Sequence, residues 1–398
     1  MMKPDEARRT SHTGAFRIAI VGGSLSTKAG GAPRSMAMQA RALSKCGLDV
    51  HLFCGYSQKY PLTPERLGVG NLKVSASLLW GPSVLGFAPG MFFRFFRTLP
   101  QLDVVHLNGA WNLTTFICAR LARCRHVPYI ISCRGHFGAY HFARKPKLKR
   151  LLYLLLEKKN VRDAAGLHLT SRWECTTSNR VTRDTRVFEI PNPVDLADFV
   201  DPVSRMEARQ SLSLGDDAFV VLCLGRLGKQ KNPAFLVNAF ADVSFPDAIL
   251  SFVGPPEMDV KRKLAKQIRA QNLHNNVRFQ EFVEGRERHL WYAAADVFAL
   301  PSFDENFCIA AVEAVASGTL CLLSPNVGVI ENLPTSHVVV RPLELQAWSR
   351  CLREFYTSRP PQRLVGVSVL DVFSEGAIGR QWLEVYKVLL QKETDSET

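Results

Sequence analysis

Short apolar runs, each followed by a helical stretch, constrain the fold of this 398-residue chain most strongly. The first run covers residues 16–21 and is followed by Gly22-Gly23. Residues 34–45 then place apolar side chains at helical spacing, and a second apolar run begins at Asp49. Runs of this length are typical of strands that are buried on both faces of a parallel sheet. The order strand, helix, strand predicts a βαβ unit.

This pattern occurs in two consecutive series. The strands expected in the first series lie at 16–21, 49–54, 103–107, 128–132, 166–170 and 187–190. Those expected in the second series lie at 218–224, 248–253, 277–279, 297–300 and 319–324. We therefore predict an α/β chain of two doubly wound, Rossmann-like domains that face each other across a cleft. In such sheets, ligands bind at the carboxyl ends of the strands.

The breaks between the two series set the expected domain boundaries. We expect a disordered leader over 1–14, an N-terminal domain over 15–190, a proline-containing linker over 191–200 and a C-terminal domain over 201–375. An amphipathic helix over 376–392 closes the chain and is expected to pack back on the N-terminal domain.

Composition narrows the classes of partner. The net charge of +14 fits nucleic acid, anionic lipid or phosphorylated substrates, but no zinc-finger or basic-zipper pattern favours nucleic acid. The ten cysteines form no CxxC pair and are expected to be reduced, buried thiols. No apolar run is long enough to span a bilayer, and the first residues lack the apolar core of a secretory signal. We expect a cytoplasmic protein.

A basic loop follows the first strand of the second series. The sequence from Gly225 to Lys231 contains Arg226, which offers a planar fork of donors, and Lys231, which offers a mobile point charge. Together they suit a diphosphate, although the order of residues is not that of a Walker A loop. The alternative is two exposed basic residues on an ordinary loop.

An acidic segment follows a later strand of the same series. Residues 301–313 include Glu305 and Glu313, with Asn306 expected to cap a helix that runs to about Ser317. Eight helical residues rise roughly 12 Å, which is too far for a pair of carboxylates that share one acid–base reaction. That separation suits two carboxylates that bind opposite ends of an extended ligand. The alternative is a capping acid and an ordinary glutamate on a helix face.

These segments resemble the signatures of the family 4 retaining glycosyltransferases, which have the GT-B fold. Ser302-Phe-Asp-Glu-Asn-Phe-Cys308 is similar to the family's Ser-x-x-Glu-Asn-Phe-Gly, with Cys308 in place of the glycine. Gly225 to Lys231 is similar to its Gly-Arg-Leu-x3-Lys, and Ile190-Pro-Asn-Pro-Val-Asp195 to its Ile-Pro-Asn-Gly-Val-Asp. The likeness extends from Phe16 to the last helix.

The resemblance implies roles for these residues. Arg226 and Lys231 would hold the diphosphate of a UDP- or GDP-sugar and stabilise the leaving nucleotide. Glu313 would bind the ribose hydroxyls, and Glu305 would contact the donor sugar. The amides of Asn306, Phe307 and Cys308 would line the sugar pocket. The family uses no metal or other cofactor, and the chain contains no Asp-x-Asp tripeptide to hold one.

The N-terminal domain, which would bind the acceptor, carries further candidates in three places. Gly30 and Gly31 lie in the loop after the first strand, where glycines allow close approach of a ligand; the alternative is an ordinary flexible loop. Many family members have a catalytic histidine after the strand at 128–132. Here Arg134 stands at that place and His136 follows it, so both are candidates. His106 is an equal candidate for a functional or a structural residue.

A basic segment suggests a membrane surface. Residues 144–162 contain eight basic residues, one acidic residue and many leucines. Such a helix could lie on anionic lipid, with aromatic anchors from residues 92–97; the alternative is a helix packed on the core with a solvated basic face.

The function expected from these features is transfer of a sugar to a glycan or lipid-linked acceptor in polysaccharide or glycoconjugate biosynthesis. A degenerate sugar-nucleotide-binding protein without turnover is the alternative from a different class. An epimerase or a phosphorylase of the same fold is a further alternative, but no pyridoxal-phosphate lysine motif is present.

Overall fold

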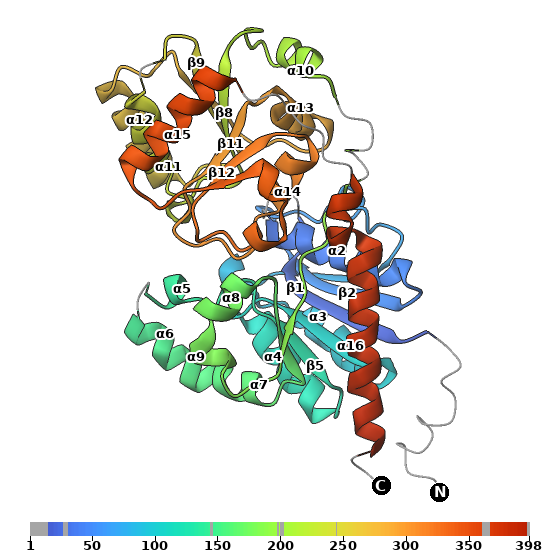
Figure 1. Ribbon diagram of the computed structural model, residues 1–398. Coiled ribbons are helices and arrows are strands. Elements are labelled where there is room, and N and C mark those ends of the chain that lie inside the picture. Colours follow the sequence, from blue (N-terminus) through green and yellow to red (C-terminus); the bar gives the residue numbers. More distant parts are fainter. Residues whose placement is uncertain are drawn as a thin grey trace, which may run out of the picture. The chain divides into compact units, whose positions relative to one another are not determined.

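The chain forms two compact α/β units (Figure 1). Unit 1 comprises Met1–Pro193 and Glu375–Thr398, and unit 2 comprises Val194–Ser374. The computed structural model describes residues 15–26, 31–143, 146–196, 199, 203–243, 245–359 and 367–395. Within this part of the chain, no helix combines the length and the apolar character needed to cross a bilayer.

Unit 1 is built on a parallel sheet of seven strands in the order β3-β2-β1-β4-β5-β6-β7. These strands are β1 (Arg17–Ser24), β2 (Asp49–Tyr56), β3 (Lys73–Leu78), β4 (Val104–Asn108), β5 (Tyr129–Ser132), β6 (Gly166–Leu169) and β7 (Val187–Glu189). The strand order reverses between β1 and β4, and the connections there leave toward opposite faces. This switch point is where an open parallel sheet forms a crevice for ligands.

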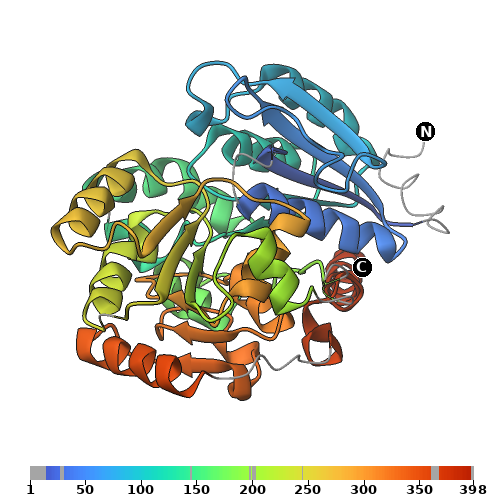
Figure 2. The ribbon, with the colours of Figure 1, turned by 90° about the horizontal axis from the view of Figure 1, so that it is seen from above.

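Alternate residues of β1 pack against helices on the two faces of the sheet. Ile18 and Ile20 belong to the core that contains α2 (Gly31–Lys45) and α16 (Glu375–Asp395). These two helices lie side by side in both views (Figures 1 and 2). The core of the opposite face includes Ala19 and Val21. Its helices are α3 (Pro89–Thr98), α4 (Leu113–Cys124) and α7 (Lys158–Arg162).

Shorter helices follow β5 and β6 in unit 1. They are α5 (Ala139–Ala143), α6 (Pro146–Leu152), a π-helical turn (Tyr153–Glu157) that continues into α7, α8 (Arg172–Thr177) and α9 (Asn179–Thr182).

Unit 2 contains a second parallel sheet, of six strands, in the order β10-β9-β8-β11-β12-β13. These are β8 (Phe219–Leu224), β9 (Ala248–Val253), β10 (Val277–Gln280), β11 (Val297–Leu300), β12 (Leu320–Leu323) and β13 (Val338–Val340). Its helices are α10 (Arg205–Ser211), α11 (Pro233–Ala241), α12 (Met258–Ala270), α13 (Arg286–Ala294), α14 (Ile309–Ala316) and α15 (Leu345–Ser358). The switch point lies between β8 and β11.

A buried ion pair ties β8 to β11 at the edge opposite their carboxyl ends. Asp296 directly precedes β11 and accepts a hydrogen bond from the Val220 amide at 2.7 Å. It also accepts one from the guanidinium of Arg209 on α10 at 2.9 Å, and both charged side chains are 1% exposed. These bonds fix the two strands that flank the switch point.

The prediction of two doubly wound, parallel α/β sheets is confirmed. Every expected strand is present, but β3 and β13 were not predicted. β3 alternates polar and apolar residues at the edge of its sheet, and β13 has only three residues. β3 therefore lacks the continuous apolar run that marks a buried parallel strand, and the run of three valines in β13 is short and only partly buried.

Two histidines are buried between the sheet of unit 1 and α16. The Ser132 hydroxyl contacts His106 Nε2 and lies 2.7 Å from His168 Nδ1. His168 Nε2 donates to the Ile190 carbonyl at 2.8 Å, and the Trp382 ring stands edge-on to both imidazoles. Burial lowers the pKa of both histidines, that of His168 to about 3. His106 therefore packs as part of the fold.

This burial makes the stability of unit 1 depend on pH. Between pH 6.5 and about 3, the unfolded chain binds a proton at His168 that the folded chain does not. The free energy of unfolding should therefore fall as the pH is lowered through this window, by at most about 1.4 kcal/mol per pH unit for this group. Urea unfolding at a series of pH values measures the slope.

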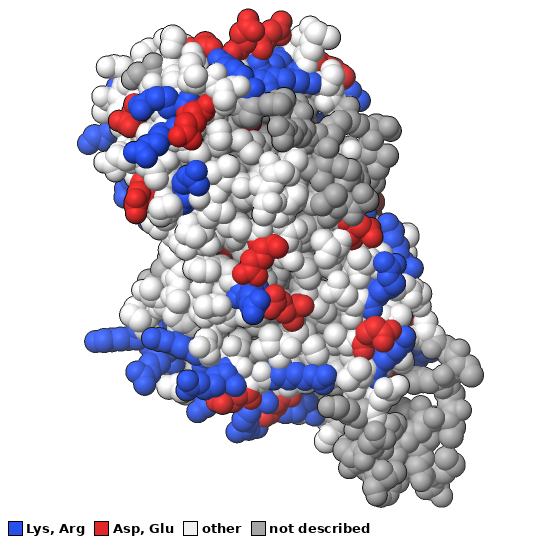
Figure 3. Space-filling view, in the orientation of Figure 1, with Lys and Arg blue, Asp and Glu red and all other residues white. Residues whose placement is uncertain are grey.

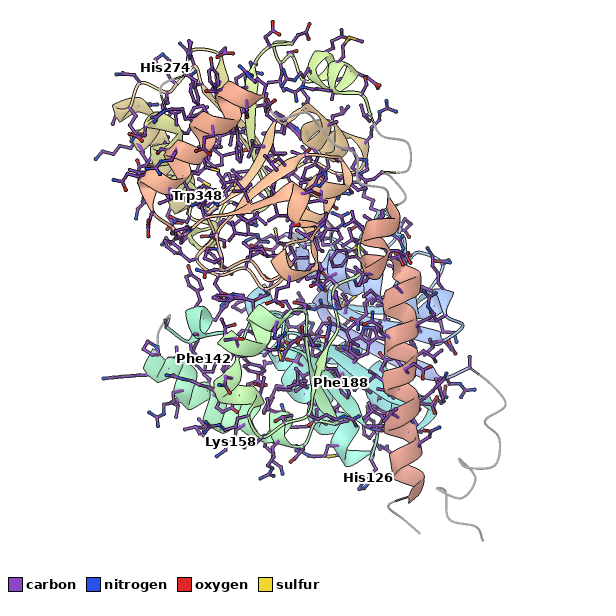
Figure 4. The ribbon with its side chains drawn as sticks, in the orientation of Figure 1. His126, Phe142, Lys158, Phe188, His274 and Trp348 are labelled. Carbon is purple, nitrogen blue, oxygen red and sulfur yellow. The ribbon has the colours of Figure 1, made fainter. Side chains whose placement is uncertain are left out.

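A matched pair of variants isolates the effect. His168→Gln retains hydrogen-bonding groups and should lose less stability on acidification than the wild type. His274→Gln changes an exposed histidine of unit 2, labelled in Figure 4, and should keep the wild-type slope. Equal slopes in all three proteins would contradict the prediction.

Candidate active site

The two loops that carry the sequence candidates of unit 2 meet at its switch point. The loop after β8 contains Lys231, and the loop after β11 contains Glu305. Lys231 Nζ lies 3.0 Å from Glu305 Oε2, and the two side chains are 15% and 23% exposed. Burial lowers the pKa of Lys231, but the neighbouring Glu305 carboxylate outweighs it and the pKa is raised overall. The lysine is therefore a firmly held cation.

Backbone hydrogen bonds fix both loops in place. The Phe303 amide donates to the Gln230 carbonyl at 2.8 Å, and the Ser302 hydroxyl donates to the same oxygen at 3.0 Å. The acidic loop is also bonded to the loop after β12. The Glu305 amide donates to the Asn326 carbonyl at 2.9 Å, and the Gly328 amide donates to the Glu305 carbonyl at 2.8 Å. Glu305 is therefore held between two loops rather than exposed on one.

A glycine makes room for the lysine. Gly225 has φ +128°, and a Cβ atom at this position would lie 3.2 Å from Lys231 Cε. Any larger residue would crowd the lysine chain and strain the backbone. The next residue, Arg226, is exposed at the rim of the loop. The loop therefore carries two cations in different surroundings: Lys231 is partly buried and Arg226 is on the surface.

The helix after this loop begins later than predicted. α14 starts at Ile309 and its N-cap is Cys308, so the prediction of Asn306 as the cap is wrong. Cys308 has φ +84° and ψ +72°, a conformation that favours glycine, although the residue is a buried cysteine. Phe307 is also buried, and its ring packs edge-on against Phe373. The side chain of Asn306 is partly buried.

The late start of α14 changes the relation between the two glutamates. Glu305 precedes the helix by four residues, so the 12 Å separation estimated from continuous helical rise does not apply. Glu313 lies in the second turn and is 1% exposed. The Tyr292 hydroxyl donates to Glu313 Oε2 at 2.8 Å, and Arg288 lies 3.4 Å from Oε1. Neither Tyr292 nor Arg288 could be recognised from the sequence as a partner of Glu313.

In unit 1, Arg134 reaches back from the loop after β5 to the end of β4. Its guanidinium donates to the side-chain oxygens of Asn108, Gln39 and Asn192. Burial lowers its pKa to about 10, so it remains charged at neutral pH. Asn108 could be suspected from its place at a strand end, but Gln39 lies in the middle of α2 and gives no such signal.

His136 is held differently from Arg134. Its Nδ1 accepts a hydrogen bond from the Ala110 amide at 3.2 Å. Burial lowers the pKa of His136 to about 4, with a smaller effect from His141, so the imidazole is neutral at physiological pH. The two candidates therefore occupy one loop with different chemistry: a cation and a neutral ring.

Trp111 connects this loop to the π-helical turn. Its indole N–H donates to the His136 carbonyl at 2.8 Å, and its backbone amide donates to Glu157 Oε1 at 2.7 Å. Trp111 itself has φ +64°. Nothing in the sequence marked Trp111 or the buried Glu157 as residues that position the His136 loop.

Two expectations from the sequence remain: that Gly30 and Gly31 lie in the loop after β1, and that no metal ion is held. Gly30 lies outside the described residues. Gly31 is the first residue of α2, so the expectation that Gly31 lies in the loop is wrong. Among the described residues, no group of three or more His, Cys, Asp or Glu side chains could hold a metal ion.

The conformation of Cys308 leads to a stability prediction. Because a left-handed backbone costs a non-glycine residue about 1–2 kcal/mol, Cys308→Gly should be more stable than Cys308→Ala by about 1 kcal/mol. The comparison uses two truncations that both remove the thiol. Chemical denaturation measures the difference in the free energy of unfolding.

Cys321 provides the matched control, because it is buried in strand β12. There the order should reverse, and Cys321→Ala should be more stable than Cys321→Gly by roughly 0.5–1 kcal/mol. The same order at both positions would contradict the conformational explanation.

Sequence comparison identifies two family models along the chain. Residues 204–363 match the model of Glycosyl transferases group 1, and residues 30–193 match that of the Glycosyl transferase 4-like domain. A D-inositol 3-phosphate glycosyltransferase from Actinosynnema mirum is 36% identical over 143 residues, which cover 34% of each chain. The UDP-Gal:alpha-D-GlcNAc-diphosphoundecaprenol alpha-1,3-galactosyltransferase of Escherichia coli is 28% identical over 235 residues, which cover 56% of this chain and 58% of the relative. The chain thus spans between about a third and three fifths of these relatives.

The fold is also found among solved structures. HepE of Anabaena, solved in complex with UDP and glucose, superposes with a TM-score of 0.73 at 18% identity, covering 94% of this chain and all of that one. This likeness identifies the GT-B fold. Together, the matched family models, the strand order of both sheets and this fold show that the chain belongs to the group 1 glycosyltransferases.

Proposed function

We propose that the chain is a metal-independent, retaining glycosyltransferase that transfers a sugar from a UDP- or GDP-sugar to a glycan or lipid-linked acceptor. The ion pair between Lys231 and Glu305 at the switch point of unit 2 carries this proposal. It places a held cation and a carboxylate at the edge of the sheet where ligands of such folds bind. The proposed reaction uses no cofactor, because the sugar nucleotide is itself the donor substrate.

The cations serve the leaving group. When the bond between the anomeric carbon and the diphosphate oxygen breaks, the diphosphate leaves with the electron pair. Lys231 and the exposed Arg226 would stabilise this developing charge without a metal ion. Because Glu305 already orients Lys231, the ammonium group needs little rearrangement to meet the phosphate.

The remaining donor contacts are assigned to the segment between Glu305 and Glu313. Glu305 would contact the sugar hydroxyls, and the amides of Asn306, Phe307 and Cys308 would line the sugar pocket. Glu313 would bind the ribose, sharing its carboxylate with Tyr292 and Arg288. In unit 1, Gly30 and Gly31 would approach the donor, and Arg134 and His136 would act near the reacting carbon.

The comparisons support the substrate classes. HepE was solved with UDP and glucose, and the E. coli relative acts on a diphosphoundecaprenol-linked acceptor according to its name. A nucleotide sugar and a phosphate-linked acceptor are therefore the classes to test first. Polysaccharide or glycoconjugate biosynthesis at the cytoplasmic face of a membrane would follow from them.

We further propose that unit 1 contacts an anionic membrane through the segment predicted at 144–162. Residues 144 and 145 lie outside the described residues, but the rest can be placed. Leu148, Leu151, Leu154 and Leu155 are 49–63% exposed, so the segment presents apolar as well as basic side chains on its surface, although Val161 at its end packs into the core. Figure 3 shows Lys and Arg side chains gathered at this edge of unit 1, where α6 and α7 lie in Figure 1 and where Figure 4 labels Lys158.

The docking face consists of these four leucines together with the exposed Lys147, Arg150 and Lys158. The acidic residue of the segment, Glu157, points inward and binds the Trp111 amide. Burying the half-exposed leucines is worth about 1 kcal/mol each, and each basic residue near anionic lipid about 1 kcal/mol. Of the aromatic residues of α3, Phe93 is exposed, while Phe92 and Phe95 are buried.

Replacement of Glu305 tests the proposed function. Glu305→Ala should reduce donor hydrolysis and sugar transfer by at least about 100-fold, because the sugar contact and the orientation of Lys231 are both lost. The fold should survive, with the free energy of unfolding lower by about 1–3 kcal/mol. Steady-state turnover and chemical denaturation provide the two measurements.

An exposed ion pair of the same unit supplies the control. Lys261 lies 3.3 Å from Glu281, and Glu281→Ala should leave turnover unchanged. Turnover near the wild-type level in Glu305→Ala would overturn its assignment. Donor binding by the wild type without hydrolysis or transfer to any acceptor would instead indicate a binding protein that has lost its activity.

Vesicle flotation tests the docking face. The chain should float with phosphatidylcholine vesicles only when phosphatidylglycerol is included. Lys147→Gln/Arg150→Gln/Lys158→Gln should weaken this binding by about 100-fold, because three charges of about 1 kcal/mol each are removed. Leu148→Ser/Leu151→Ser/Leu155→Ser should also weaken it.

Helix α12 offers a matched control, since its exposed Arg262, Lys263 and Lys266 lie on an amphipathic helix without exposed leucines. Arg262→Gln/Lys263→Gln/Lys266→Gln should float like the wild type. If the α6–α7 triple variant and the α12 triple variant lose vesicle binding equally, then net charge, and not the docking face, determines the binding.

A further inference from the structure

Arg134 is a partly buried cation whose hydrogen bonds go only to neutral groups. Its Nε and Nη2 donate to Asn108 Oδ1 at 3.1 and 2.8 Å, and Nη2 also donates to Gln39 Oε1 at 3.2 Å. Nη1 donates to the side-chain oxygen of Asn192. All these acceptors are amide oxygens. The guanidinium is therefore well oriented but not neutralised by its contacts.

No carboxylate among the described residues forms an ion pair with Arg134. Glu174 attracts it electrostatically, but the oxygens of Glu174 are engaged elsewhere. Oε2 accepts from the Thr170 amide at 2.7 Å and from the Thr170 hydroxyl at 2.8 Å, and Oε1 accepts from the Gly135 amide. A desolvated cation without a paired anion is costly, so such charges are usually found with a counter-ion.

The side-chain amide of Asn108, beside Arg134, has a donor without an acceptor. Because Asn108 Oδ1 accepts two bonds from the guanidinium, the orientation of the Asn108 amide is fixed. Its Nδ2 is buried and has no hydrogen-bond partner among the described residues. A buried donor in this state calls for an explanation, and the oxygen of a bound ligand could serve as its acceptor.

The position of the pair supports a ligand site. Asn108 ends β4 and Arg134 follows β5, so both lie at the carboxyl edge of the sheet, beside the switch point between β1 and β4. Arg134 itself has φ +49°. Such strained conformations are concentrated at functional sites, where the surrounding bonds enforce them.

We propose that Arg134 and Asn108 form an oxyanion site that binds a phosphate or phosphate ester. One phosphate oxygen would accept from Asn108 Nδ2 and another from the second N–H of Nη1, and the phosphate charge would neutralise the guanidinium. The amide oxygens of Gln39 and Asn192 hold the guanidinium plane for this contact. The proposal that this site binds phosphate does not depend on the proposed function. Only the source of the phosphate, donor or acceptor, rests on it.

Inorganic phosphate is the probe, and thermal unfolding of the full chain is the measurement. The background variant Arg226→Ala/Lys231→Ala removes the cations of unit 2. In this background, added phosphate should still raise the midpoint of unfolding, because it binds only the folded chain. No shift with phosphate in this background would overturn the proposal.

Asn108→Asp installs the missing anion within the chain. An aspartate oxygen can still accept from Arg134, and its second oxygen replaces the unsatisfied Nδ2. In the same background, this variant should unfold at a midpoint a few degrees higher without phosphate and lose the phosphate-dependent shift. Asn179→Asp, an equal charge change at an exposed asparagine of unit 1, should keep the shift.

The opposite behaviour would contradict the proposal. If Asn108→Asp unfolds more readily than its parent, or keeps the full response to phosphate, then Arg134 does not lack a counter-ion. In the Arg226→Ala/Lys231→Ala background, Arg134→Lys should need at least a tenfold higher phosphate concentration for the same rise in the unfolding midpoint, because a point charge cannot reproduce the fork.

Two substrates could supply the phosphate: the acceptor and the donor sugar nucleotide. Kinetics of the single variant Arg134→Lys, with Arg226 and Lys231 intact, distinguish them. A raised KM for a phosphate-linked acceptor with an unchanged donor KM assigns the site to the acceptor. A raised KM for the sugar nucleotide in donor hydrolysis assigns it to the donor diphosphate. Unchanged values for both substrates would overturn a role in substrate binding.

Discussion

The ion pair between Lys231 and Glu305 is the interaction on which the site of unit 2 depends. It joins the loops of two strands that are neighbours in space but distant in sequence. Gly225 leaves room for the lysine chain, and the backbone bonds of Phe303 and Glu305 fix the acidic loop. At the other edge of the same strands, Asp296 and Arg209 secure their pairing. The doubly wound sheet thus converts two separate motifs into one charged site.

The buried cation of unit 1, Arg134, has different partners from those of Lys231. Lys231 has a carboxylate beside it, whereas Arg134 is held by amide oxygens and retains its charge for a ligand. The neutral His136 and the Trp111–Glu157 contacts tie the same loop to the helix that carries the exposed leucines. A single short region therefore combines the acceptor-side candidates with the surface proposed to meet the membrane.

The sequence was sufficient for much of the fold, because buried parallel strands are continuous apolar runs. It failed where that signal is absent, at the alternating edge strand β3, and where it is very short, at the three valines of β13. At the site, motif spacing led to Lys231 and Glu305, but not to the late start of α14, which depends on the loop as a whole. Nor could it identify Gln39, Asn108 and Asn192 as partners of Arg134, because these contacts join residues far apart in the chain.

The proposed function requires that the charged edge of unit 2 binds a sugar nucleotide. Calorimetric titration of the whole chain with a panel of UDP- and GDP-sugars measures this binding. At least one of them should bind at millimolar concentration or below, the range of ordinary substrate affinities, and Lys231→Ala should abolish the heat of binding. If no member of the panel binds the wild-type chain in this range, this edge is not a sugar-nucleotide site and the proposed function is wrong.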